Sequence, residues 1–199
     1  MIFYTFFKKL FSDDFPKRGI DYEAKTDDAQ IGGINRFDKT FSQPEIEPTR
    51  VEELISMADN SVKKEDLLDA KKALESALII DENNIDVLIR YAYILNSIND
   101  FNGAKEYYQK VINQEPLNDM AYASLANIFH KLGDDKKAIE YHKKSIELDK
   151  DYAPHYFNYA NTQYDRKEFE EAKKLYFKAL QLDDKLQEAE DMMRKIYKE

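Results

Sequence analysis

The stretch FNYANTQYDRKEFEEAKKLYFKALQLD, residues 157–183, decides how this chain folds. It places alanine at Ala160, Ala172 and Ala179, where a compact helical domain usually carries bulkier side chains. Because alanine is the best helix former, one such segment indicates only a preference for helix. A second copy in the same register would indicate a packing requirement, since small side chains are needed where two helix axes approach closely.

The pattern recurs at an interval of 34 residues. Three series of small residues keep this interval, the third more loosely: Ala58, Ala92, Ala126 and Ala160; Ala70, Ala104, Ala138 and Ala172; Ala77, Val111, Ser145 and Ala179. Two series of larger residues run in phase with them: Leu54, Leu88, Tyr122 and Tyr156; Met57, Tyr91, Leu125 and Tyr159. A fixed period of this length predicts a repeat array, in which each unit packs against its neighbours.

Helices are expected throughout the array. Thr49 is a good N-cap, and Glu52 completes a possible capping box at the start. Each unit has room for two helices of roughly thirteen residues, a length that is marginal for an isolated helix in water. Each helix must therefore bury its apolar face against a neighbour.

The four units, residues 51–84, 85–118, 119–152 and 153–186, resemble the tetratricopeptide repeat family. In the third unit the resemblance rests on Tyr122, Leu125, Ala126, Gly133, Asp134, Ala138 and Ser145, and in the second on Pro116. It implies an all-α, right-handed superhelical solenoid of antiparallel helix pairs. Residues 187–199 resemble the capping helix that closes such arrays.

The resemblance also implies that the first helix of each unit lines a concave groove for another protein's peptide segment. The candidate contact residues are Tyr93, Asn127, His130, Phe157, Asn158, Asn161 and Tyr164. Asparagine can pair with both groups of a peptide backbone, and aromatic rings supply apolar area. Alanine at the three asparagines is expected to weaken partner binding without lowering the melting temperature. The alternative is that these residues are merely polar residues on an exposed helix face.

One version of the family grips an anionic carboxy-terminal tail with asparagines and cationic residues. Asn127 and Asn158 fall on the two asparagine positions, but Ala123, Glu188 and Met192 occupy the cationic ones. An anionic carboxy-terminal chaperone tail is therefore not the expected partner.

Composition and net charge limit the partners and the chemistry that we expect of this chain. The net charge of -9 argues against a nucleic-acid surface and favours basic partners through electrostatic steering. The partner's peptide segment is expected to be basic or apolar. No cysteine is present, and His130, His142 and His155 form no metal-binding motif. We expect no catalytic residues, no metal and no cofactor. His142 falls on an aromatic position of the repeat, where the resemblance implies a packing role.

Residues 1–48 are predicted to be an arm, with a short amphipathic segment at residues 1–11 and an irregular linker after it. The apolar segment MIFYTFFKKLF is too short to span a bilayer and is a poor signal peptide, so the cytoplasm is the expected compartment. Docking on the array itself or on a partner is favoured over binding to a membrane surface, because so short a helix gives only marginal adsorption. The chain is thus interpreted as a non-enzymatic scaffold or adaptor. The alternatives are a membrane-peripheral assembly factor anchored by residues 1–11, or a regulatory subunit of a larger complex.

Overall fold

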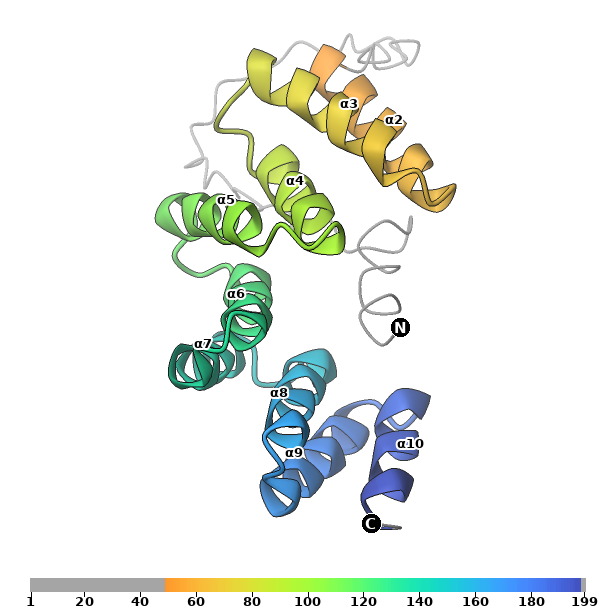
Figure 1. Ribbon diagram of the computed structural model, residues 1–199, viewed down its shortest axis with the longest axis vertical. Coiled ribbons are helices and arrows are strands. Elements are labelled where there is room, and N and C mark those ends of the chain that lie inside the picture. The colour runs from red at the N-terminus through yellow and green to blue at the C-terminus, as the bar shows by residue number, and fades with distance from the viewer. Residues whose placement is uncertain (1–48, 198–199) are drawn as a thin grey trace, which may run out of the picture.

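The computed structural model describes residues 49–197, which form helix pairs stacked along one long axis (Figure 1). The pairs are α2 (Arg50–Lys63) with α3 (Leu67–Ile80), α4 (Ile85–Ser97) with α5 (Phe101–Gln114), α6 (Asp119–Lys131) with α7 (Asp135–Leu148), and α8 (Ala153–Asp165) with α9 (Phe169–Leu182). A last helix, α10 (Gln187–Ile196), packs against α9. The predicted all-α solenoid is confirmed. The predicted arm, including residues 1–11, lies outside the described residues.

The small residues of the repeat are buried between the helices. The eight alanines of the first two series of small residues are at most 1% exposed: Ala58, Ala70, Ala92, Ala104, Ala126, Ala138, Ala160 and Ala172. A larger side chain at any of them would need the space that a neighbouring helix occupies.

The turns inside the pairs repeat with the same period. The residue with a positive φ angle in each turn is Glu65, Asn99, Gly133 or Lys167, with φ of 63°, 64°, 81° and 64°. Glycine adopts this left-handed conformation without strain, but only the third turn has a glycine at this position. The neighbouring contacts therefore impose this conformation on the other three turns.

The helix starts divide the molecule into two parts. The predicted capping box of Thr49 and Glu52 is present in α2. Side-chain caps also begin α3 to α7, at Asp66, Asn84, Asp100, Asn118 and Asp134. The residues at the starts of α8, α9 and α10 make no such bond. A side-chain cap stabilises a helix by about 1 kcal/mol, so the last three helices lack a contribution that the others have.

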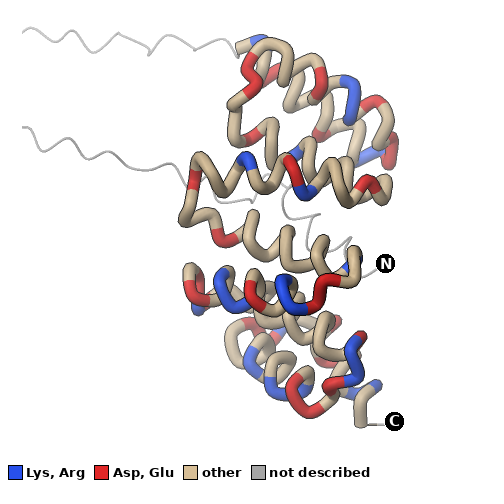
Figure 2. Tube along the Cα trace, turned by 60° about the vertical axis from the view of Figure 1, so that its left-hand side comes forward, with Lys and Arg blue, Asp and Glu red and all other residues tan. Residues whose placement is uncertain are grey.

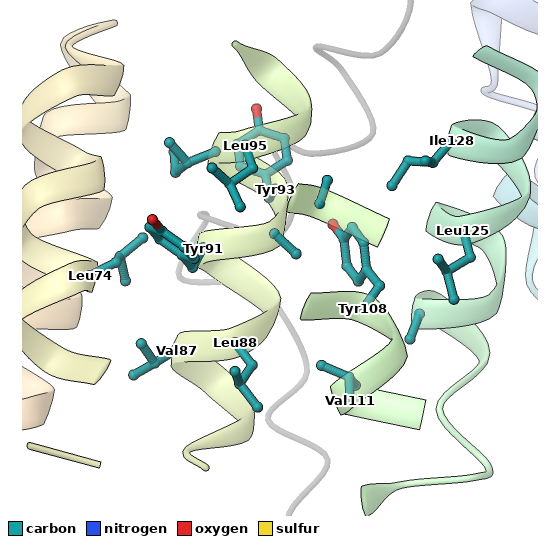
Figure 3. Packing of buried hydrophobic residues seen from close by; sticks show 14 of the residues in the cluster. Leu74, Val87, Leu88, Tyr91, Tyr93, Leu95, Tyr108, Val111, Leu125 and Ile128 are labelled. Carbon is teal, nitrogen blue, oxygen red and sulfur yellow. The ribbon is translucent and has the colours of Figure 1, made fainter. Parts of the chain in front are cut away.

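The buried apolar residues divide at the same place. One cluster runs from Leu54 on α2 to Ala138 on α7. Figure 3 shows its centre, where Leu74, Tyr91, Tyr108 and Leu125 come from successive helices. A second, smaller cluster joins α8, α9 and α10, with Tyr176 and Ile196 among its members. The core is therefore interrupted between α7 and α8.

We call the contacts between successive helix pairs the first, second and third joints, counted from α2. The first and second joints lie within the larger apolar cluster, and the third joint separates the two clusters.

Met57, the first residue of the second series of large residues, lies outside the core. Tyr91, Leu125 and Tyr159 are buried as the period predicts, but Met57 is 54% exposed. No helix pair among residues 49–197 precedes α2, so nothing described covers this face of the first unit.

Candidate peptide-binding groove

A small pocket lies where α6 and α8, the first helices of their pairs, come together. It has a volume of about 30 Å³, enough for one small polar group or one water. Its walls are polar: Asn127, His130 and Lys131 come from α6, and Asn158, Asn161, Thr162 and Asp165 come from α8. The pocket brings together four of the seven residues that the sequence predicts to contact a partner.

Asn158 is the pocket residue with an unpaired buried group. Its side chain is buried, with 6% of the residue exposed, and Nδ2 has no hydrogen-bond partner among the described residues. A buried amide donor without a partner destabilises a fold by about 1–3 kcal/mol, and most buried polar groups are paired. A ligand that offers an acceptor at this point would remove that penalty.

Asn161 is held in place from the opposite side. The buried Tyr176 hydroxyl lies 2.6 Å from Asn161 Oδ1 and donates to it. Burial raises the pKa of Tyr176, so this hydroxyl remains protonated and able to donate. Because its oxygen is occupied, Asn161 has its NH2 group for other contacts. The asparagines of α8 therefore make the pocket rich in donors.

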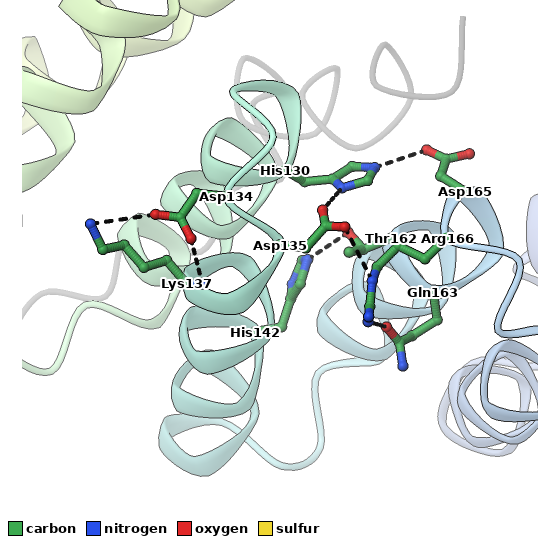
Figure 4. Close-up of polar contacts among 9 residues, drawn as sticks. All are labelled: His130, Asp134, Asp135, Lys137, His142, Thr162, Gln163, Asp165 and Arg166. Carbon is green, nitrogen blue, oxygen red and sulfur yellow. Dashed lines mark hydrogen bonds and ion pairs between the residues drawn. The ribbon is translucent and has the colours of Figure 1, made fainter.

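His130 links three helices at the rim of the pocket (Figure 4). Its Nδ1 lies 2.8 Å from Asp135 Oδ1 on α7, and its Nε2 lies 3.2 Å from Asp165 Oδ2 on α8. Arg166 Nε lies 3.2 Å from the other oxygen of Asp135. Both contacts of the ring are hydrogen bonds when it is an imidazolium, whereas the neutral ring can donate to only one carboxylate.

The three aromatic candidates lie outside the pocket. Tyr93 belongs to the larger apolar cluster and Phe157 to the smaller one, where its ring centroid lies 5.8 Å from that of Tyr176. Tyr164 is half-buried beneath α10, with Lys195 Nζ 4.8 Å from its ring centroid. Because Tyr93 and Phe157 are buried, little of their side-chain surface is accessible to a partner. Both rings are surrounded as packing residues are.

Three pocket residues, Lys131, Thr162 and Asp165, were not among the candidates from the sequence. Thr162 follows Asn158 by four residues, and Asp165 follows Asn161 by four. Residues four apart lie on the same face of a helix, so this spacing alone could have identified both.

The charged residues around the groove form no basic surface. Acidic and basic positions are interspersed along the helices in Figure 2, and many pair within one helix, as Lys72 does with Asp69 and Arg194 with Glu190. Within residues 49–197, no group of three or more acidic or histidine side chains is placed to hold a metal ion. None of the helices in this part of the chain is long and apolar enough to cross a membrane.

The array of helix pairs defines the class of protein, a helical repeat solenoid, and comparisons with known proteins specify the family. Tetratricopeptide repeat profiles match residues 61–128, 121–154 and 153–186. The chain belongs to the tetratricopeptide repeat family.

Known proteins of similar sequence and structure carry the same repeat. A repeat-containing protein of Methanocaldococcus jannaschii is 31% identical over 121 residues, which cover 60% of this chain and 21% of that protein. The chain thus spans about a fifth of this curated relative. The crystal structure of MamA superposes with a TM-score of 0.60 at 22% identity, over 71% of this chain and 83% of that one. YrrB, described as a tetratricopeptide repeat protein with an unusual peptide-binding site, gives 0.62 at 19% identity, over 72% and 74%.

Proposed function

We propose that this protein is a non-enzymatic scaffold or adaptor, and that it binds an extended segment of another protein along α6 and α8. The single observation that carries the proposal is the unpaired, buried Nδ2 group of Asn158 in the pocket. The peptide-binding site named for YrrB, which has the same fold, supports it by analogy.

The chemistry of the pocket favours a main-chain carbonyl group of the bound segment. Asn158 and Asn161 both have NH2 groups to donate, and the pocket has room for one small acceptor. The cations needed to hold a carboxylate are sparse, because Lys131 is the one lysine or arginine among the lining residues and the acidic Asp165 lines the pocket as well. A partner whose main chain is extended and whose side chains are basic or apolar fits this surface.

Selection from a library of random linear peptides would test the proposal. Peptides selected on the natural protein are measured again on Asn158→Ala, and we expect the dissociation constant to rise about 2- to 10-fold, the effect of one lost hydrogen bond. Stability should not fall by more than about 0.5 kcal/mol, because the lost Nδ2 group has no hydrogen-bond partner among residues 49–197. This combination of weaker binding with retained stability distinguishes a contact residue from a packing residue.

Asn113→Ala is the matched control, because Asn113 is an exposed asparagine near the end of α5. It should leave peptide affinity unchanged. Equal affinity of the natural protein and Asn158→Ala for every selected peptide would refute the assignment of this pocket.

A further inference from the structure

The third joint contains all three histidines of the chain. His130 on α6 contacts Asp165 on α8, and His142 on α7 contacts Thr162 on α8, with 2.9 Å between Nε2 and Oγ1. His155 on α8 contacts Asp119 on α6 across 2.8 Å. Each histidine therefore bridges the same two helix pairs, as Figure 4 shows for His130 and His142. The first and second joints contain no histidine.

Comparison of equivalent residues shows what has changed at this joint. Leu74 and Ile94 at the first joint correspond to Tyr108 and Ile128 at the second, and all four belong to the larger apolar cluster. At the third joint the same repeat positions hold His142 and Thr162, both fully buried. At these repeat positions the third joint therefore has a hydrogen-bonded polar pair, whereas the first and second joints have members of the larger apolar cluster.

The buried polar side chains other than tyrosine among residues 49–197 all come from α6, α7 and α8: Ser124, Asn127, His142, Ser145, His155, Asn158, Thr162 and Gln163. Of these, Ser124 lies beside Tyr108 of α5, at the second joint. The apolar clusters end on either side, and α8 to α10 lack side-chain caps. In an array whose stability is a sum of unit and neighbour terms, the weakest interface opens first.

We propose that the third joint is an acid-operated hinge, at which α8–α10 separates from α2–α7 as one block when the pH falls below neutral. This inference concerns the opening of the array and does not depend on what the groove binds.

His142 supplies the sensitivity to acid. Burial, with smaller contributions from His130 and His155, lowers its pKa from 6.5 to about 3, so it is neutral in the closed joint. When the joint opens, water reaches the ring and the pKa returns toward 6.5. The open state then binds a proton that the closed state does not. The equilibrium constant for closure of the joint keeps its full value above pH 6.5. It falls about tenfold for each pH unit below pH 6.5, down to about pH 3.

Other charged groups also lie at the joint. They are Asp119, His130 and Lys131 on α6, Asp135 on α7, and His155, Asp165 and Arg166 on α8. His130 contacts both Asp135 and Asp165. His155 needs only one protonated nitrogen for its bond to Asp119, and its other nitrogen has no partner among the described residues.

Hydrogen–deuterium exchange of the full chain tests the hinge at pH 7.5 and pH 5.5, with rates corrected for intrinsic exchange. In the natural protein we expect the opening constant of α8–α10 to rise about tenfold between these pH values, because His142 gains a proton when the joint opens. The helices α4 and α5 should show no comparable change.

The double variant His142→Leu/Thr162→Val gives the converse result. It replaces both partners by apolar residues, and leucine is the residue that the first joint has at this position, in Leu74. We expect the acid-dependent opening to disappear. If this variant does not fold, the contrast between α8–α10 and α4–α5 in the natural protein remains decisive. An equal rise in α4–α5 and α8–α10, or no rise in α8–α10, would overturn the hinge.

Discussion

The larger block, α2–α7, and the smaller block, α8–α10, share one 34-residue register but differ in what holds them together. In the larger block each helix begins with a side-chain cap, and the joints lie within the larger apolar cluster. Polar contacts also cross the first joint, where Arg90 pairs with Asp59 and the Tyr91 hydroxyl donates to Glu75. In the smaller block no helix has such a cap, and the joint that attaches it is polar. A constant period therefore fixes the geometry of an array without fixing the strength of its interfaces.

The difference between the joints coincides with the pocket. Asn158 and Thr162 line it, and both are buried at the third joint. The equivalent residues of the preceding unit are Ser124 and Ile128. Polar side chains there supply the donors that a peptide would need, and they also remove apolar contact from the interface. Binding sites often reduce stability in this way, because groups arranged for a ligand are not arranged for the fold.

The largest effect is expected where equivalent residues of the two joints are truncated. Ile128→Ala removes a fully buried aliphatic side chain from the second joint and should cost about 2–5 kcal/mol. Thr162→Ala leaves His142 Nε2 without its partner and should cost less, about 1–3 kcal/mol. Urea denaturation of the two variants measures both. An equal or larger loss in Thr162→Ala would mean that the polar joint is as strong as the apolar one.

A smaller effect is expected at Asn161, and it reverses a prediction made from the sequence. Alanine at Asn127, Asn158 and Asn161 was predicted not to lower the melting temperature. Because Asn161 accepts the hydrogen bond of Tyr176, Asn161→Ala should instead cost about 1–3 kcal/mol.

The double variant Asn161→Ala/Tyr176→Phe provides the control for this effect. It removes the hydroxyl together with its acceptor and should recover most of the loss in thermal denaturation. A single variant as stable as the natural protein would show that the Tyr176 bond contributes nothing.

The fold was predictable from the sequence because the 34-residue period places a small residue in the same packing environment in every unit. The cap of Thr49 was predictable because its chemistry is local. The surroundings of Tyr93 and Phe157 were not, since the repeat assigns a helix face but not how far a ring turns toward neighbouring residues. The bond between His142 and Thr162 joins residues 20 apart on different helices, and no pattern within one helix indicates it.

The smallest effect is expected at the start of α9. Its N-cap residue, Glu168, has a side chain one methylene group longer than the aspartates at the equivalent positions of the larger block. Asp66, Asp100 and Asp134 begin the second helix of their pairs, and each accepts a hydrogen bond from a backbone amide three residues later. Glu168 occupies the equivalent position with φ of -83° and ψ of 62°, close to the -91° and 68° of Asp134, but it makes no such bond. Its longer side chain is the remaining difference.

Glu168→Asp should therefore restore the cap and raise the free energy of unfolding by about 1 kcal/mol, and the reciprocal Asp134→Glu should lower it by a similar amount. Amide exchange locates each change. Because Glu168 lies in the smaller block, its substitution should slow the opening of α8–α10 and leave α4 and α5 unaffected. Slower exchange throughout the array would show that the two blocks open together, and the difference between them would then be one of composition and not of stability.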